Sequence, residues 1–314
     1  MNKLTVPVFF STDENYVPFL AVAVRSLIDN ASSDNNYEIY ILNTDLSEES
    51  KARISAMQTE NVTISFVDVK ERLSLLGNGL NLRDYYTVSI YYRLFIPSMF
   101  PEINRAIYLD CDIVVLDDIA KLYDTEMGNM LLGVVPDQVV KSYSLFRDYV
   151  EDVVGVKWEN YFNSGMLLMN LDALRKAQIE EKFLDIFNRY QFRTVAPDQD
   201  YLNHLCKDRV LYLDRSWNVM WSKEKYSGNL RIIHYNMFRK PWIYADVPFG
   251  DYFWQYADRT DYAEKIHAMR ARFLFVQRIK DRVGLNGMFK ICKSIAATDN
   301  TFRMVLCDGG KRDE

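Results

Sequence analysis

The sequence has little cysteine, and its few thiols are not arranged for a shared metal or for a disulfide framework. The 314 residues include four cysteines, which form no C-x-x-C pair and no zinc-type spacing: Cys111, Cys206, Cys292 and Cys307. This pattern argues against a cysteine-based zinc site and a disulfide-rich secreted scaffold. The simplest prediction is a reduced, cytoplasmic setting.

Long apolar runs are also missing. No uninterrupted apolar stretch reaches the roughly 18 residues that a membrane-spanning helix needs. The opening segment, MNKLTVPVFFSTDENY, has too short an apolar part, followed too soon by acidic residues, for a signal peptide. We therefore expect neither a spanning helix nor a secretory leader in this sequence.

Neither sign of charge dominates. The chain has 38 Lys and Arg against 43 Asp and Glu, and its formal net charge is −5. Such a balance argues against a nucleic-acid partner held by bulk electrostatics. The sequence shows no internal repeat and no low-complexity linker, and its length suits one large domain or two.

What the sequence does contain is centred on the stretch RAIYLDCDIVVLDD, residues 105–118. Its apolar first part, with β-branched and aromatic residues, predicts a buried strand. This strand leads directly to Asp110 and Asp112, whose carboxylates project to the same side of an extended chain. Paired oxygens suit a hard divalent cation, and ligands of open α/β sheets collect beyond the carboxyl ends of strands. On spacing alone, a turn that uses Asp for backbone hydrogen bonds is an equal alternative.

The order of the other segments predicts an α/β fold with a mostly parallel central sheet flanked by helices. In the first part of the chain, expected strands and helices alternate: Val6–Thr12, Phe19–Ile28 after Pro18, Tyr37–Leu42, a helix from the Ser47 cap to Met57, and Val62–Val67. Further along we expect a loop at Leu73–Asn81, a helix at Val88–Ile96 that Pro97 terminates, strands at Leu131–Val135, Val210–Leu213 and Arg231–His234, a strand at Asn163–Asn170 opened by a small-residue turn, and helices at Tyr143–Val153, Ile179–Tyr190 and Pro197–Cys206.

The composition changes after about Asp246. Between Lys265 and Lys293 there are eight Lys and Arg but a single acid, Asp281. Apolar residues interleave with these bases: Phe273, Leu274, Phe275, Val276 and Ile279. A basic amphipathic helix on an anionic membrane surface is one interpretation. The alternative is a helix that packs on the main domain and exposes a basic face to solvent.

Four more segments have residues that could take part in binding or catalysis, and each also has a purely structural interpretation. In Asn163-Ser164-Gly165, the glycine permits close approach of the backbone to a ligand, or it only forms a turn. Asp198-Gln199-Asp200, taken alone, is better explained as a helix cap. His234 is either a ligand or a core histidine, and Lys240-Pro241-Trp242 is either a binding turn or a surface turn.

Together and in this order, these segments resemble glycosyltransferase family 8. The resemblance covers about residues 6–242 and rests on FFSTDENYVPFLAVAVRSL, YYRLFIP, AIYLDCDIVVLDDI, YFNSGMLLMNL, PDQDYLN and IHYNMFRKPW. Members of this family are retaining enzymes that use nucleotide sugars, such as the bacterial lipopolysaccharide galactosyltransferases and glycogenin, and they have the GT-A type of nucleotide-binding fold. The resemblance implies a GT-A catalytic domain over residues 1–245 and a helical, basic C-terminal region over residues 246–314.

The resemblance also implies roles for single residues. Asp110 and Asp112 match the family's D-x-D motif and His234 its third metal ligand, so the implied cofactor is Mn²⁺ (or Mg²⁺). The residues implied for nucleotide-sugar binding are Asp13, Asn15 and Tyr16 at the uridine, Arg93 and Asn163 at the donor sugar, Asp110 and Cys111 in the D-x-D motif, and Lys240 at the diphosphate. Asp198 and Gln199 match the site near the anomeric carbon, and Asp137 falls where acceptor contacts are expected.

One position departs from the family pattern. Family members often have H-x-x-G-x-x-K-P-W, whereas this chain has Met237 in place of the glycine. A side chain there removes the freest backbone approach to a phosphate. The departure leaves the exact path of the loop undecided, whereas the assignment of Lys240 does not depend on it.

The resulting prediction is a metal-dependent retaining enzyme of bacterial lipopolysaccharide or polysaccharide biosynthesis. It would move glucose or galactose from UDP-glucose or UDP-galactose to a hydroxyl of a glycan or glycolipid, in the cytoplasm and in peripheral contact with the inner face of the membrane through residues 265–293. Because Gln199 is a poor nucleophile, same-face substitution is favoured over attack by Asp198. A nucleotide-sugar hydrolase or pyrophosphorylase is the alternative; a non-catalytic binding protein would be expected to have lost ligands.

Overall fold

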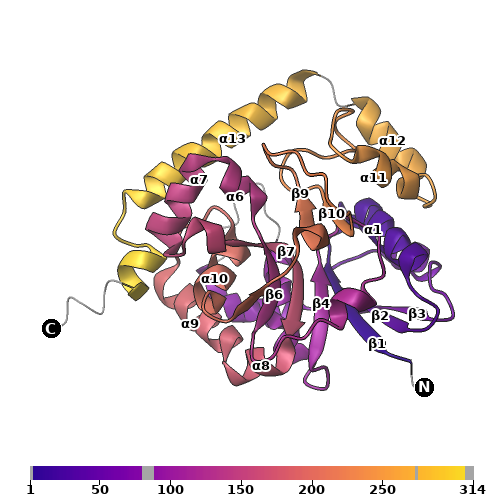
Figure 1. Cartoon of the computed structure of the whole chain (residues 1–314), viewed down its shortest axis with the longest axis horizontal. Helices are drawn as coiled ribbons and strands as arrows, with labels where there is room; N and C mark the ends of the chain where they lie inside the picture. The colour runs from indigo at the N-terminus through magenta and orange to yellow at the C-terminus, as the bar shows by residue number, and fades with distance from the viewer. Residues whose placement is uncertain (1–2, 80–87, 273–274, 308–314) are drawn as a thin grey trace.

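The computed structural model of the protein describes residues 3–79, 88–272 and 275–307. A central sheet lies between helices, and further helices form the C-terminal part of the chain, as Figure 1 shows. The predicted α/β architecture is confirmed. The loop expected at Leu73–Asn81 lies partly outside the described residues. Within them, Ser74–Gly79 forms a 3₁₀ helix rather than an open loop.

Seven strands form the main sheet in the described part of the chain, in the order β3-β2-β1-β4-β7-β6-β8. Their bounds are β1 Thr5–Ser11, β2 Asn36–Asn43, β3 Val62–Asp68, β4 Arg105–Leu109, β6 Leu132–Pro136, β7 Phe162–Asn170 and β8 Val210–Tyr212. The pairs β1–β2, β2–β3, β1–β4 and β6–β8 are parallel, whereas β7 runs antiparallel to both β4 and β6. The sheet is therefore mostly parallel, as expected from alternating strands and helices.

A small second sheet brings distant parts of the chain together. It has the order β5-β10-β9, with β5 Ile113–Val115, β9 Val219–Met220 and β10 Ile232–His234. In the antiparallel pair β5–β10, His234 lies opposite Ile113. This pairing places the histidine beside the end of the Asp110–Asp112 turn, although the two segments are far apart in sequence.

The helices begin where local chemistry favours them. Pro18 lies in the first turn of α1, and the Ser47 side chain accepts a hydrogen bond from the Ser50 N–H at the start of α2, as predicted. The described helices are α1 Val17–Asn30, α2 Glu48–Ser55, α3 Lys70–Leu73, α4 Ile96–Met99, α5 Ala120–Tyr123, α6 Gln138–Ser142, α7 Ser144–Tyr149, α8 Leu171–Lys176, α9 Ile179–Tyr190, α10 Pro197–Cys206, α11 Gly250–Ala257, α12 Ala263–Arg272 and α13 Phe275–Ala296.

The core lies on both faces of the main sheet. Alternate residues of β1 show this directly, because Val8 and Phe10 pack in one apolar cluster and Phe9 packs in another. The first cluster includes α1, and the second includes α9 and α10. All three side chains are fully buried, so the strand that carries the candidate uridine loop at its end is fixed from both sides.

Three local expectations were wrong. Pro97 does not terminate a helix: residues Val88–Phe95 form a 3₁₀ helix, and Pro97 lies in the first turn of α4, where its missing N–H is not needed. Asn163–Gly165 are not a turn before a strand but part of β7. The basic C-terminal stretch is not one helix but two, α12 and α13; Phe273 and Leu274 lie outside the described residues.

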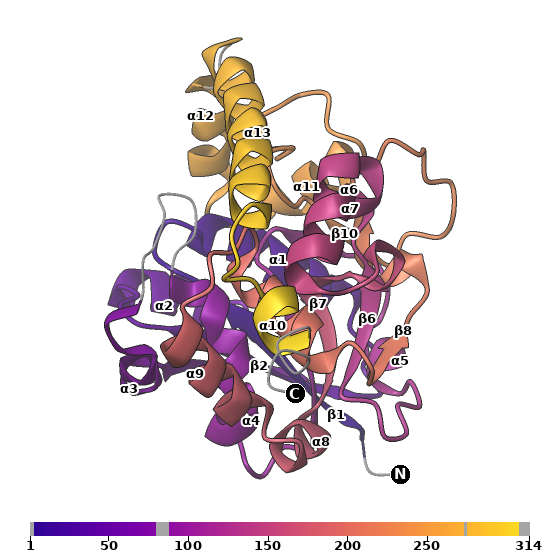
Figure 2. The ribbon, with the colours of Figure 1, turned by 90° about the vertical axis from the view of Figure 1, so that its left-hand side faces the viewer.

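Helix α13 packs on the rest of the protein through one side. Cys292 and Ile295 are buried in a cluster with residues of α7, and the Phe289 ring lies 5.1 Å from that of Phe146. Figures 1 and 2 show the helix running past α7 towards α12. The chain then returns to the core, where Phe302 is fully buried against Tyr201. No helix in the part of the chain that the structure describes is long and apolar enough to cross a membrane.

Candidate active site

A large cavity of about 950 Å³ opens at the carboxyl ends of β1 and β4. Of the thirteen residues to which the family resemblance gave a role, twelve line it: Asp13, Tyr16, Arg93, Asp110, Cys111, Asp112, Asp137, Asn163, Asp198, Gln199, His234 and Lys240. Asn15 does not line the cavity; it is exposed, and its backbone N–H donates to Asp13 Oδ1 at 2.9 Å. The fold thus gathers residues from most of the chain length into one space of ligand size.

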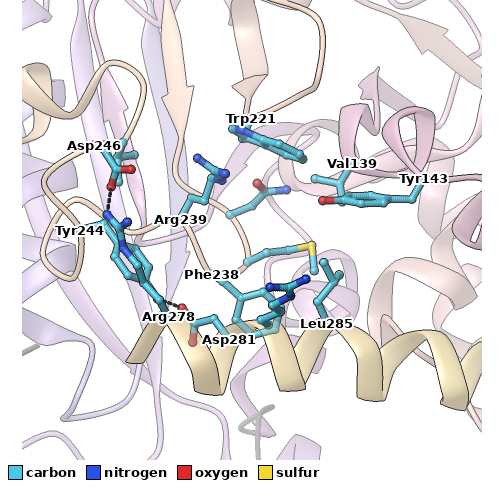
Figure 3. Close-up of a pocket in the computed structure, with 14 residues that line it drawn as sticks. Val139, Tyr143, Trp221, Phe238, Arg239, Tyr244, Asp246, Arg278, Asp281 and Leu285 are labelled. Carbon is cyan, nitrogen blue, oxygen red and sulfur yellow. Dashed lines mark hydrogen bonds and ion pairs between the residues drawn. The ribbon is translucent and has the colours of Figure 1, made fainter. Parts of the chain in front are cut away.

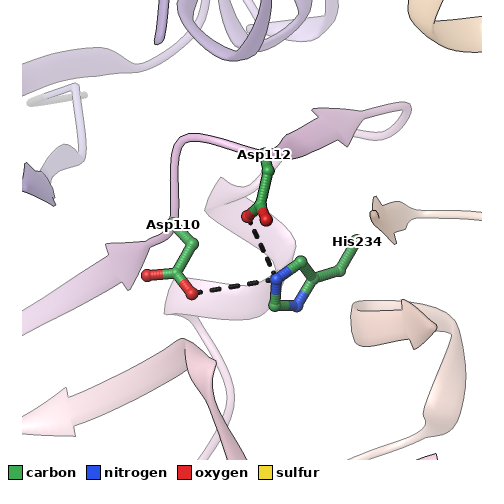
Figure 4. A group of neighbouring side chains, drawn as sticks. All are labelled: Asp110, Asp112 and His234. Atoms are coloured by element: carbon green, nitrogen blue, oxygen red, sulfur yellow. Dashed lines mark ion pairs between the residues drawn. The ribbon is translucent and has the colours of Figure 1, made fainter. Parts of the chain in front are cut away.

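Asp110, Asp112 and His234 converge in this cavity (Figure 4). His234 Nε2 lies 3.1 Å from Asp112 Oδ1 and 3.7 Å from Asp110 Oδ2. One ligand atom from each residue lies within 4.8 Å of the others. The Asp pair is therefore not merely a turn that caps its own backbone.

A chain of hydrogen bonds fixes which nitrogen of His234 faces the carboxylates. Asn218 Nδ2 donates to Asn163 Oδ1 at 3.0 Å, so Asn218 Oδ1 is the atom that faces His234 Nδ1 at 3.1 Å. Nδ1 must then carry a proton, so Nε2 is the ring nitrogen that faces the two carboxylates. Support of this kind for the distal ring nitrogen is typical of metal-ligating histidines.

The donor set fits a divalent cation. Three groups with lone pairs and up to two negative charges converge, an arrangement that is stable when a cation lies between them. The Lys240 ammonium donates to Asp112 Oδ2. Although burial opposes ionisation of Asp112, the charges of Lys240 and His234 outweigh it and hold the pKa of Asp112 below its ordinary value.

Gly165 is the position where backbone comes closest to this cluster. A Cβ atom there would lie 2.3 Å from His234 Cε1 and 2.5 Å from Asp110 Oδ2. Its carbonyl also accepts the Asp110 N–H at 2.8 Å. Only glycine leaves room for both side chains, which gives a physical reason for the small residue that the sequence had marked.

Arg93 connects the cluster to α10. Its buried guanidinium lies 2.9 Å from Asp110 Oδ1 and 3.2 Å from Asp198 Oδ2, and it stacks 4.2 Å from the centre of the Tyr108 ring. Asp198 also accepts from the Ser164 hydroxyl at 2.9 Å. Asp198 is not the N-cap residue of α10, which is Ala196; its side chain bonds to Arg93 and to Ser164 of β7. Burial, reinforced by Asp110, raises the pKa of Asp198 despite the opposing charge of Arg93.

Gln199 and Asp137 share a second network beside Asn163. Gln199 Oε1 accepts from Ser164 N–H at 3.0 Å and from Asn163 Nδ2 at 3.1 Å, and its Nε2 donates to Asp137 Oδ2 at 3.2 Å. The other oxygen of Asp137 caps α6 by accepting the N–H groups of Val139 and Val140. Both side chains are buried and oriented by several bonds.

Asp200 lies behind these residues and holds α10 in place. It is fully buried and accepts hydrogen bonds from the hydroxyls of Tyr149 at 2.7 Å and Tyr161 at 2.5 Å. Burial raises the pKa of Asp200 to about 6, in spite of these hydrogen bonds. The carboxyl is therefore less acidic in the folded protein than in the unfolded chain.

Asp200→Asn is expected to remove a pH-dependent loss of stability. Because the folded-state pKa of about 6 exceeds the ordinary 3.8, the free energy of unfolding should fall between about pH 4 and pH 6, by roughly 3 kcal/mol from this group. The variant lacks the titration, so its stability relative to the native protein should rise over that range. Urea unfolding at several pH values measures it, and parallel curves for the two proteins would contradict the assignment.

The turn at Lys240-Pro241-Trp242 is anchored to α1. The Trp242 ring stacks on Phe19 at 3.8 Å between centroids, and both are buried. Met237, the departure from the family pattern, has φ of 54°, the left-handed conformation that glycine adopts most easily. The loop thus keeps a backbone conformation suited to glycine and adds a side chain to it.

Several residues of the site were missed by sequence reasoning. Asn218, which orients His234, and Tyr108, which lies under Arg93, have no local sequence signal because their roles depend on pairing across sheets. Gln277 and Gly284 of α13 also line the cavity. Their contribution was hidden by the interpretation of that helix as a membrane contact or a solvated face.

The sequence of the chain matches one family of known proteins. The family model of Glycosyl transferase family 8 matches residues 7–246. The chain is 28% identical to a putative glycosyltransferase of Haemophilus influenzae over 68% of its own length and 63% of the relative's. It is 31% identical to glycosyltransferase GlyB of Streptococcus pneumoniae over 80% of its own length and 61% of the relative's. The chain thus spans less than two thirds of the length of these two relatives.

Another relative is a lipopolysaccharide 1,2-glucosyltransferase of Escherichia coli, 29% identical over 79% of this chain and 77% of the relative. Among solved structures, the galactosyltransferase LgtC in complex with donor and acceptor sugar analogues has a TM-score of 0.66 at 24% identity, over 82% of this chain and 96% of LgtC. At this identity, the likeness shows a shared fold.

Proposed function

Because this chain belongs to glycosyltransferase family 8, we propose that it moves glucose or galactose from a UDP-sugar to a hydroxyl of a glycan or glycolipid, with retention of configuration. The observation that carries the proposal is the convergence of Asp110, Asp112 and His234 in a cavity that also holds Lys240 and Arg93. These groups suit a diphosphate and its cation. Residues 1–245 would form the catalytic domain, and α13 would add one wall of the cavity.

Asp110, Asp112 and His234 would hold Mn²⁺ or Mg²⁺. Such an ion, when bound, neutralises charge on a departing diphosphate. Lys240 and Arg93 are fixed cations in the same cavity, and they would stabilise the same charge without moving. Asp13 would hold the uridine together with Tyr16, since its carboxylate already orders this loop by accepting the N–H groups of Asn15 and Tyr16.

The contacts of Asp198 and Gln199 support same-face substitution. A double displacement needs a free nucleophile behind the anomeric carbon. Asp198 is paired with Arg93 and Ser164, and the amide oxygen of Gln199 already accepts two hydrogen bonds. We therefore propose that these residues position the donor sugar and that the leaving phosphate accepts the proton of the acceptor hydroxyl. Asp137 would contact the acceptor.

The donor assignment predicts that UDP stabilises the protein more than GDP or ADP does when Mn²⁺ is present. The uridine loop would accept the smaller base, and thermal shift measures the difference. Equal stabilisation by all three nucleotides would remove the assignment of Asp13 and Tyr16. With the donor known, proton NMR of the product should show the α configuration of the UDP-sugar.

The rival function is a nucleotide-sugar hydrolase or pyrophosphorylase. Turnover of the donor, measured with and without an acceptor, distinguishes it from transfer. Turnover without an acceptor at the rate of transfer would favour the hydrolase. The relationship to a lipopolysaccharide glucosyltransferase supports a lipopolysaccharide or polysaccharide acceptor, which a glycan array would test.

We also propose a peripheral contact between α13 and the anionic inner face of a membrane. Ile279 and Val283 are 50% and 63% exposed on this basic helix. Native protein should co-sediment with phosphatidylglycerol vesicles more than with phosphatidylcholine vesicles, and salt should weaken the binding. Ile279→Ser with Val283→Ser should reduce it. Equal sedimentation with both vesicle types would exclude the contact.

A further inference from the structure

A second cavity, of about 290 Å³, adjoins the candidate active site. The two cavities share part of their lining: Val139, Asn236, Met237, Phe238 and Asp281. The rest of the lining of the second cavity includes Tyr143, Trp221 and Arg278, as Figure 3 shows, and also Arg282 of α13. Its position next to the site, and outside it, makes it a place for the remote part of a substrate.

The acids of this cavity already have partners. Asp246 Oδ1 lies 2.8 Å from Arg278 Nη2. Asp281 accepts hydrogen bonds from the Tyr244 hydroxyl and, at 2.8 Å, from Gln277 Nε2. Neither carboxylate is therefore free to neutralise the other cations of the cavity.

Two guanidinium groups remain. Both Arg239 and Arg282 line the cavity and are exposed. Among the described residues, no carboxylate lies within ion-pair distance of either of them. The fork of N–H donors on an arginine matches the oxygens of a phosphate or carboxylate and binds them with strong, charge-assisted hydrogen bonds.

Aromatic rings lie beside these cations. The Arg239 guanidinium stacks 4.8 Å from the centre of the Trp221 ring, which leaves its edge donors available. The Trp221 and Tyr143 rings are stacked with centroids 6.0 Å apart. Apolar ring surface beside a few polar groups is the usual composition of a small-molecule site, and it suits the carbon face of a saccharide.

We propose that this cavity binds an acidic substituent, a phosphate or a carboxylate, on a sugar unit of the acceptor remote from the hydroxyl that is glycosylated. The inference rests on the proposed function, since it takes the substrate to be a saccharide that extends from the active site past Met237 and Phe238. Arg239 and Arg282 bind the anionic group, and Trp221 with Tyr143 contacts the ring that bears it. The enzyme therefore selects acidic acceptors over neutral ones.

The test uses isothermal titration calorimetry of the full chain with glucose, glucose 6-phosphate, glucuronic acid and inorganic phosphate, without metal and without nucleotide. We expect glucose 6-phosphate and glucuronic acid to bind about tenfold or more tightly than glucose, as charge-assisted hydrogen bonds would give. The double variant Arg239→Gln with Arg282→Gln should lose this preference. Lys280→Gln with Lys290→Gln removes the same charge from exposed positions of α13 outside the cavity, and should keep it.

Two results would overturn the proposal. One is a preference for the acidic sugars that survives in the Arg239 and Arg282 double variant, because the anion would then bind elsewhere, such as beside Lys240. The other is inorganic phosphate binding as tightly as glucose 6-phosphate, because the cavity would then recognise an anion and not a sugar that carries one. The calorimetry contains neither UDP-sugar nor Mn²⁺. A failure of the proposed transfer reaction would therefore appear separately, as absent turnover of the donor.

Discussion

Asp112→Asn is expected to slow sugar transfer on the order of 100-fold or more while the protein remains folded. The change removes one of two carboxylates from the group that would hold the cation, and several kcal/mol of transition-state stabilisation should go with it. Asparagine keeps an oxygen for Lys240. Alanine would leave that buried ammonium without its partner, and the loss of activity would be mixed with a loss of stability.

The direct measurement for this variant is a Mn²⁺ titration in the presence of UDP, with turnover measured alongside. His234→Ala should weaken Mn²⁺ binding to a similar extent. Asp117→Asn is the matched control, because Asp117 lies on the same stretch but pairs with Lys121 at 2.6 Å, away from the cavity. If His234→Ala binds Mn²⁺ and turns over like the native protein, His234 is a core histidine and the three-residue cluster is not a metal site.

Gly165→Ala should be nearly as damaging, although it removes no functional group. Its methyl group would lie 2.3 Å from His234 and 2.5 Å from Asp110, so at least one of the two must move. Overpacking in a buried strand also costs about 1–3 kcal/mol of stability. We expect Mn²⁺ affinity and transfer to fall together, with a lower melting temperature.

Gly287→Ala provides the comparison for this experiment. Gly287 lies in α13, and a Cβ atom there would meet nothing within 4 Å. In a helix interior, alanine is favoured over glycine by about 1 kcal/mol, so this variant should be at least as stable as the native protein. Native-like Mn²⁺ binding by Gly165→Ala would mean that the backbone of β7 yields easily, and that the close approach is not a requirement of the site.

The sequence predicted those features of the fold that depend on neighbouring residues. Alternating strands and helices, the Ser47 cap and the strand that ends just before Asp110 follow from local patterns, and the structure confirms them. Pro97 was misplaced because proline suits the first turn of a helix as well as the position after its end. Local chemistry alone does not distinguish these two positions.

The site was less accessible to sequence reasoning because it is built by long-range pairing. The link from His234 to Asp112 depends on the antiparallel pairing of β10 with β5, and no local pattern encodes it; only the family resemblance suggested it. The role of Asn218 depends on two further bonds across sheets. Arg278 and Arg282 of the second cavity belong to the basic run of the sequence, whereas Arg239 does not. That Arg239 and Arg282 have no carboxylate partner among the described residues became clear only in three dimensions.

The pairing of β5 with β10 also has a consequence for biosynthesis. A ribosome releases the N-terminal part of a chain first, so a nascent chain has Asp110 and Asp112 long before it has His234. Until β10 emerges, the two acids have neither the imidazole nor the ammonium of Lys240 beside them. The proposed metal site would therefore form late, only after β10 has paired with β5. An mRNA truncated before the codons of β10 would therefore encode a protein that lacks this site altogether, rather than one with reduced activity.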